Sequence, residues 1–321
     1  MLKNVGKDVS KLFHKFHSDG VLREYNHLKI GTLEGYVPRN VTYEWKEGKE
    51  FGDMVPFGDP YWYQNWNSPY YNQSHKRWLE FVRAWAEKEI APFVKEWDEK
   101  QCMPIRSLLK KAANAGLLGV FVGLPWPTDL LGPNIATGIL PHQLDSFHEF
   151  ILVDELARSG SGGCSNGWAS GITIGLPVVL HFGSDFLKKE VCKPVLNGDK
   201  VICLAITEPE AGSDVANIQT QAVLSEDKRY FIVTGQKKWI TNGLWADYFT
   251  TAVRTGQKGS KGISILVIPM QEGITVSHME CMGLWGSGTA LVTFNNVKVP
   301  VEYMVGQLNQ GFKLLMFNFN H

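Results

Sequence analysis

Two short stretches of the chain place hydroxyl groups, tight turns and an aromatic ring directly after predicted β-strands. The first, TEPEAGSD at 207–214, follows an apolar run at 201–206. Its backbone N–H groups and hydroxyls can bind a phosphate or the polar edge of a ring. The second, KKWITNG at 237–243, follows a strand-like run at 230–233. The two strand ends can lie side by side, and their hydroxyls, backbone N–H groups and aromatic ring can then form one wall of a binding site.

Trp239 and Thr241 belong to the second stretch. Alternate side chains of a strand share a face, so both are predicted to point the same way. An indole and a hydroxyl on one face can pack on, and hydrogen-bond to, a flat heterocycle. Taken singly, each stretch is more often an ordinary turn or a core tryptophan. Together they predict a site for a large, flat, phosphate-bearing cofactor.

Composition limits the class of protein. The chain has 321 residues, 44% hydrophobic and 20% charged, which is typical of a soluble globular protein with room for two domains or more. Basic and acidic residues number 32 each, which argues against a nucleic-acid partner. Five cysteines without a CxxC pair predict reduced thiols and no metal site. No apolar run reaches membrane-spanning length. We expect an intracellular protein, cytoplasmic rather than mitochondrial, because acidic residues interrupt its basic start.

The pattern of apolar residues changes once along the chain. Helical spacing dominates the first part, with a start at Ser68 as N-cap and further helices at 105–115, 145–158 and 169–182. After 198, short β-rich runs are separated by turn signals. These runs lie at 201–206, 218–224, 230–234, 248–253, 263–269, 274–278 and 291–294. The prediction is an α+β chain, with an all-helical domain followed by an antiparallel β-barrel or sandwich. No GxGxxG opens a βαβ unit.

The combination ITEPEAGSD and KKWITNG resembles the signature of the acyl-CoA dehydrogenase flavoprotein family. Further matches lie at 182–184, 283–290, 293–300 and 306–312, so the resemblance covers roughly 61–321. The lead-in DPYWYQNW at 59–66 looks like the fungal branch. The family fold adds a C-terminal four-helix bundle, and the apolar end GFKLLMFNFNH at 311–321 predicts that the chain is truncated before most of it.

The first residues resemble part of a cytochrome b5 domain, on FHKFHS at 13–18 and IGTL at 30–33. There His17 would be a haem ligand, but the partner motif H-P-G-G is not in this chain. Haem binding is therefore not expected, and His17 is interpreted as an ordinary helix-end histidine. The predicted domains are a partial cytochrome b5-like segment (1–35), a linker (36–69), a helical domain (70–198), a β-domain (199–304) and the start of the C-terminal helical domain (305–321).

The resemblance implies bound FAD and α,β-dehydrogenation of an acyl-CoA, with hydride passing to the flavin. Ser213 would also lie near the acyl-CoA, Trp239 would pack on the flavin ring, and Thr241 would donate a hydrogen bond towards it. The residues implied to line the cofactor are Leu204, Thr207, Gly212, Ser213, Trp239 and Thr241.

The family's catalytic Glu lies in the C-terminal bundle, so no catalytic residue is assigned in this chain. Glu208 is interpreted as part of a structural turn rather than as a base. Trp285 stands where many members carry Arg, which leaves the acyl or CoA contacts near Ser287 open. Family members are homo-oligomers, and the sequence does not identify the electron acceptor. Two alternatives stay open: a catalytically inactive fragment, and a family member with a non-CoA substrate, as in nitroalkane oxidases.

Overall fold

The computed structural model of the chain describes residues 60–64 and 68–319. The cytochrome b5-like prediction with His17, and most of the predicted linker, lie outside the described residues. The chain divides into two compact units, Met1–Lys76 and Arg77–His321. Within the described residues, all the strands and most of the helices belong to the second unit, which carries the candidate site.

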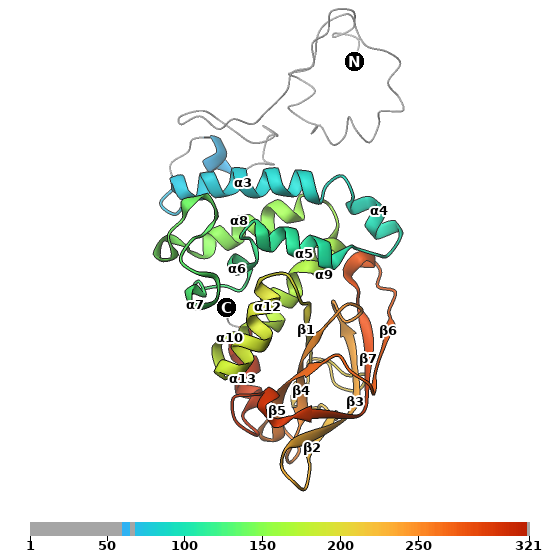
Figure 1. Cartoon of the computed structure of the whole chain (residues 1–321). Helices are drawn as coiled ribbons and strands as arrows, with labels where there is room; N and C mark the ends of the chain where they lie inside the picture. The colour runs from blue at the N-terminus through green and yellow to red at the C-terminus, as the bar shows by residue number, and fades with distance from the viewer. Residues whose placement is uncertain (1–59, 65–67, 320–321) are drawn as a thin grey trace, which may run out of the picture. The chain divides into compact units, whose positions relative to one another are not determined.

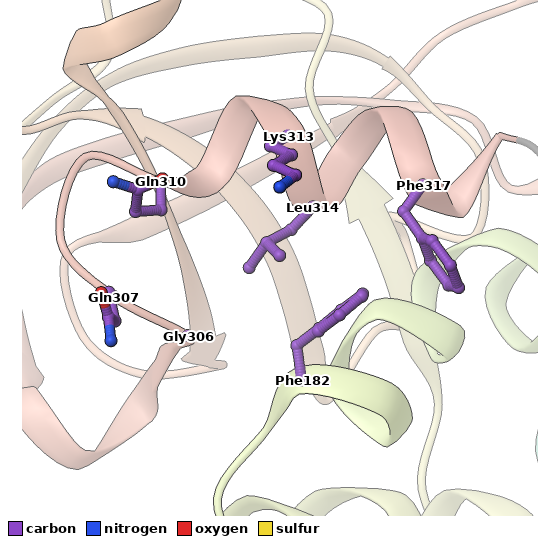
Figure 2. A pocket seen from close by; sticks show the side chains of 7 residues that line it. All are labelled: Phe182, Gly306, Gln307, Gln310, Lys313, Leu314 and Phe317. Atoms are coloured by element: carbon purple, nitrogen blue, oxygen red, sulfur yellow. The ribbon is translucent and has the colours of Figure 1, made fainter.

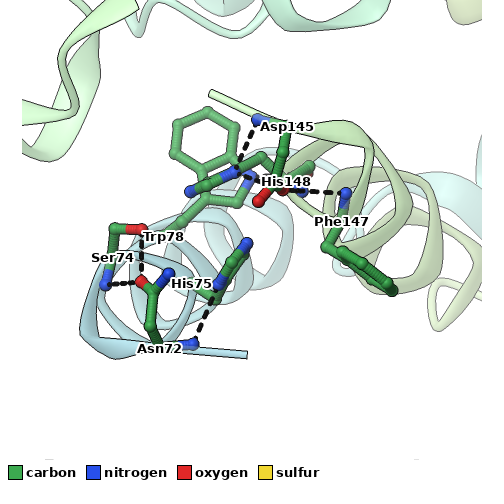
Figure 3. A network of polar contacts seen from close by, with 7 residues as sticks. All are labelled: Asn72, Ser74, His75, Trp78, Asp145, Phe147 and His148. Atoms are coloured by element: carbon green, nitrogen blue, oxygen red, sulfur yellow. Dashed lines mark hydrogen bonds and ion pairs between the residues drawn. The ribbon is translucent and has the colours of Figure 1, made fainter. Parts of the chain in front are cut away.

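The first long helix, α3 (Gln73–Glu89), begins later than the sequence predicted. Ser68 is not its N-cap, because the Ser68 hydroxyl accepts from the backbone N–H of Tyr70 at 3.2 Å within a preceding turn. The side chain of Asn72 instead accepts from the N–H of Ser74 at 2.8 Å (Figure 3). An Asn in this position satisfies one of the N–H groups that a helix start leaves without a partner.

Helix α5 (Ile105–Asn114) of the second unit buries one face. Its buried residues Ile105, Leu108, Leu109 and Ala112 follow helical spacing, and Gly116 at φ +74° follows its end. The other helices, several of them single turns, are α4 (Val94–Glu99), α6 (Leu118–Phe121), α7 (Thr128–Leu131), α8 (Ser146–Ala157), α9 (Gly162–Ser170), α10 (Pro177–Phe182), α11 (Asp185–Leu187), α12 (Lys193–Leu196) and, after the strands, α13 (Gly311–Asn318).

Polar groups anchor the buried helix ends. Asp145 caps α8 by accepting from the N–H of Phe147 at 3.0 Å (Figure 3). The buried indole of Trp78 donates to the carbonyl of His148 at 2.8 Å, which ties α3 to the start of α8. These contacts satisfy polar groups that burial would otherwise leave without partners.

The strands form one sheet that Figure 1 shows beside the helical layer. Their bounds are β1 (Ile202–Ala205), β2 (Gln221–Leu224), β3 (Tyr230–Ile240), β4 (Tyr248–Arg254), β5 (Ile263–Pro269), β6 (Ile274–His278), β7 (Ala290–Pro300) and β8 (Met304–Val305). The order is β6-β7-β3-β2-β4-β5-β8, with β1 paired to β4. Most pairs are antiparallel, as predicted, whereas β1–β4 and β2–β4 are parallel. The predicted order of a helical part followed by a β-domain is confirmed.

Two bulges interrupt the pairing of the long strands β3 and β7. On β7 the extra residue lies opposite the step from Val233 to Gly235, and on β3 it lies between Lys237 and Ile240. The sequence placed a turn at Asn295-Asn296, but β7 continues through it, with Asn296 at φ +52°. A bulge adds one residue to one strand and reverses which face the following side chains point to.

The helical layer packs closely on β1 and β4. A π-helical turn, Gly171–Gly175, follows α9, and its Gly175 carbonyl accepts from the buried Thr250 hydroxyl of β4 at 2.8 Å. Asp247 accepts from the Arg106 guanidinium of α5 at 2.8 Å and from the backbone N–H of Val201 at 2.8 Å. These contacts fix the start of β1 against the helices. None of the helices within the described residues has the length and apolarity needed to cross a membrane.

Candidate functional site

The first predicted segment leaves the sheet at the end of β1. Cys203 and Ala205 are buried in the core of the sheet, whereas Leu204 between them is half-buried on the other face. Beyond Thr207, the chain closes a tight turn in which Glu208 and Ala211 exchange backbone hydrogen bonds of 2.9 and 3.3 Å. The turn therefore presents the residues that follow it, Gly212 and Ser213, to solvent.

The second predicted segment ends β3 differently from the prediction. Trp239 lies at the bulge with φ +64°, and its side chain is 53% exposed. The strand ends at Ile240, so Thr241 belongs to the following turn. The strand alternation on which the prediction for Trp239 and Thr241 rested therefore does not extend to Thr241. The bulge is what turns Trp239 outward while Ile240 enters the core.

The structure brings the two segments together, although β1 and β3 do not pair as neighbouring strands. The backbone N–H of Lys238 donates to the carbonyl of Thr207 at 2.7 Å. The bond lies one residue before Trp239. The backbone of Thr207 therefore lies beside the residue that precedes Trp239.

A buried ion pair at this junction was missed by the sequence analysis. The Lys237 ammonium contacts Glu208 Oε1 at 2.6 Å, and both side chains are almost fully buried. Lys237 also donates to the carbonyl of Ile206 at 3.0 Å. Glu208 accepts from the backbone N–H groups of Gln219 and Thr220. Its carboxylate is thus fully occupied, in agreement with a structural role.

The electrostatics of the pair favour two charged groups at neutral pH. Burial acts to raise the pKa of Glu208, but the Lys237 ammonium and the hydrogen bonds from Gln219 and Thr220 outweigh it, so this pKa lies below its ordinary value. Burial lowers the pKa of Lys237 to about 8, against the attraction of Glu208. Burial dominates at the ammonium, whereas the partners of the carboxylate outweigh its burial, so the pKa values of both groups fall.

The turn after Thr241 is fixed by the segment that contains Ser287. Asn242 lies at φ +68° and donates its backbone N–H to the Ser287 carbonyl at 3.1 Å. Its Oδ1 is buried and has no hydrogen-bond partner among the described residues. The Ser287 hydroxyl is buried against that of Thr289 at 2.7 Å, whereas Trp285 is 38% exposed.

A cavity of about 410 Å³ lies elsewhere, between α10 and α13 (Figure 2). Phe182 and Phe317 meet edge to face on its wall, with ring centroids 5.0 Å apart. Lys313 is the charged side chain among its lining residues. None of the predicted cofactor contacts lines this cavity, so it is not part of the candidate site.

Comparison with known proteins assigns the family. Residues 72–199 match the N-terminal domain of acyl-CoA dehydrogenases, and residues 203–297 match the middle domain. The chain is 41% identical over 276 residues to "Acyl-CoA dehydrogenase AFT10-1" of Alternaria alternata, covering 84% of this chain and 62% of that protein. It is 39% identical to "Acyl-CoA dehydrogenase apdG" of Emericella nidulans, covering 83% of this chain and 62% of that protein. The chain belongs to the acyl-CoA dehydrogenase family.

Solved structures agree with this assignment. A probable acyl-CoA dehydrogenase from Mycobacterium abscessus superposes with a TM-score of 0.68 at 35% identity, covering 77% of this chain and 62% of its own. The chain thus spans about 62% of the length of the curated relatives and of this structure. The helical and β-rich parts described above are the parts that match.

Proposed function

We propose that this chain carries one wall of an FAD site that serves α,β-dehydrogenation of an acyl-CoA thioester. The observation that supports it most is the junction of the 207–213 turn with the exposed Trp239, in a member of this family. Flavin is the redox group of the proposed reaction: when bound, FAD accepts hydride from the substrate. A solved acyl-CoA dehydrogenase from Bacillus anthracis holds FAD; at 24% identity, its likeness to this chain concerns the fold.

The local surface fits such a group. Trp239 leaves a large apolar ring 53% exposed, and a flat heterocycle packed on it would cover that surface. At Gly212, a side-chain carbon would meet no atom within 4 Å, so the backbone is open to a close approach. In this proposal Trp239 packs on the flavin ring and Thr241 donates a hydrogen bond towards it. The residues proposed to contact FAD are Leu204, Thr207, Gly212, Ser213, Trp239 and Thr241.

The proposal extends to the remaining features of the chain. Ser213 would also contact the acyl-CoA, and the protein would form homo-oligomers, as family members do. The proposed domains are helical at 70–198 and β-rich at 199–304, with 305–321 belonging to a further helical domain. The thiols of all five cysteines are free, which supports an intracellular location. We assign no catalytic base within this chain.

The test measures flavin retention by the purified chain and the response of the bound flavin to candidate substrates. Wild type is expected to retain FAD through gel filtration, and Trp239→Ala to retain much less. Phe150→Ala is the matched control, because Phe150 is a similarly exposed aromatic (57%) on α8 in the helical part. Because no base for the α-proton is assigned within this chain, an acyl-CoA, rather than a nitroalkane, is expected to bind and shift the flavin absorbance without bleaching it. Loss of FAD from wild type would overturn the proposal. Retained FAD whose absorbance no acyl-CoA shifts would overturn the acyl-CoA part of it.

A further inference from the structure

The Glu208–Lys237 pair connects segments that no strand ladder joins. Glu208 belongs to the turn after β1, and Lys237 lies near the end of β3. β1 pairs with β4, whereas β3 pairs with β2 and β7. The regular pairing of the sheet therefore joins these two ends only indirectly, through β2 and β4.

Each charged group also binds backbone outside its own segment. The ammonium of Lys237 reaches across to the Ile206 carbonyl at 3.0 Å, just before the turn. The carboxylate of Glu208 binds the N–H of Thr220 at 3.0 Å, in the loop that leads into β2. The Thr220 hydroxyl in turn donates to the carbonyl of Gln236 at 3.3 Å, next to Lys237. The contacts close a ring of bonds around the base of both segments.

Such a buried ion pair fixes how its two residues lie relative to each other, and breaking it costs folding free energy. Two charges removed from water need each other and their further hydrogen bonds, and loss of one partner leaves the other uncompensated. The backbone hydrogen bond from Lys238 to Thr207 lies next to the ion pair, because Lys238 follows Lys237 and Thr207 precedes Glu208. A shift of the pair would move Thr207 and Trp239 relative to each other.

We propose that Glu208 and Lys237 are positioning residues that set the spacing between the turn at 207–213 and the end of β3 at 238–241. The effect on FAD binding rests on the proposed FAD site, whereas the effect on the spacing of the two segments concerns the chain alone. Neither residue reacts with substrate or cofactor. Each acts through the backbone that presents Thr207, Ser213 and Trp239.

The test separates positioning from general stability. Lys237→Met leaves Glu208 buried without its counterion, whereas Lys237→Met/Glu208→Gln removes both charges and keeps an amide oxygen for Thr220 N–H. Lys110→Met is the matched control, because Lys110 pairs with Asp199 at 2.6 Å with both side chains about half exposed. Thermal unfolding, hydrogen–deuterium exchange and FAD affinity are measured for each variant.

Lys237→Met is expected to unfold at a lower temperature, and the double variant to recover most of that loss. Both are expected to show exchange about tenfold faster at 207–213 and 238–241 and FAD binding about tenfold weaker. The control is expected to match wild type. The inference fails if the double variant keeps wild-type exchange in these segments, or if exchange rises equally along β4 and β5. Absence of FAD binding by wild type overturns the proposed function, and the exchange data still decide whether the pair positions the segments.

Discussion

A methyl group added at Gly171 tests how tightly the helical layer fixes the first strand of the site. A Cβ at this position would lie 2.0 Å from the Ile202 carbonyl oxygen and 2.9 Å from Asn242 Nδ2. Carbon–oxygen contacts in proteins are about 3.3 Å or longer, so the π-helical turn and β1 must separate by about 1 Å or more. The nearest atom is backbone, so no flexible side chain can absorb the shift.

Gly162→Ala, on the preceding helix α9, is the matched substitution. Its Cβ would meet its nearest atoms at 3.4 Å, which is ordinary contact. Overpacking costs about 1–3 kcal/mol, and the gain from replacing glycine in a helix, up to about 1 kcal/mol, applies in the same direction to both variants. We therefore expect Gly171→Ala to lose about 2 kcal/mol of unfolding free energy relative to Gly162→Ala.

Urea unfolding at fixed temperature, followed by far-UV circular dichroism, measures this difference. The slope with denaturant is expected to stay unchanged, and the midpoint to fall for Gly171→Ala alone. FAD affinity is expected to fall with it, because the moved strand carries Leu204 and leads into Thr207. Equal midpoints for the two variants would refute the reasoning, since the fold would then have room where the structure has contact.

Two further predictions concern charged groups. The pKa of Glu208 lies below its ordinary value of 4.5, so its contribution to stability is fully present above pH 4.5 and is lost as the pH falls through the lower folded value. The unfolding free energies of wild type and Glu208→Gln are therefore expected to converge as urea titrations move below pH 4.5; a gap that stays constant would contradict this. Arg106→Ala is expected to cost about 0–1 kcal/mol, because its side chain is 57% exposed. Asp247→Ala is expected to cost about 1–3 kcal/mol in the same assay, because it also removes the acceptor of the Val201 N–H; equal costs would argue against that role.

Local patterns predicted most of the fold. The runs at 263–269 and 274–278 coincide with β5 and β6, because clear turn signals bound both. A turn after β1 was likewise predicted from the small residues within 207–214, and the structure closes it between Glu208 and Ala211. These features depend on neighbours in sequence, which a single chain shows directly.

Features set by distant pairing escaped the sequence analysis. Gly235 and Asn296 look like turn residues but lie inside β3 and β7, because the partner strand absorbs their special backbone geometry as a bulge. The outward direction of Trp239 follows from the second bulge, which strand alternation in the sequence does not show. The burial of Lys237 depends on Glu208, which is distant in the chain and carries no periodic signal.

The polar character of the Glu208–Lys237 pair has a physical explanation in this topology. Apolar side chains in the same place would fill the space, and by the area they bury they could stabilise the fold as well. Contacts between apolar side chains have no preferred direction, however, so the end of β3 could shift slightly relative to the turn. An ion pair with fixed hydrogen bonds to Ile206 and Thr220 permits one arrangement, because every other one leaves a buried charge without a partner. A site built from strand ends that do not pair needs that restriction, and here burial of two charges supplies it.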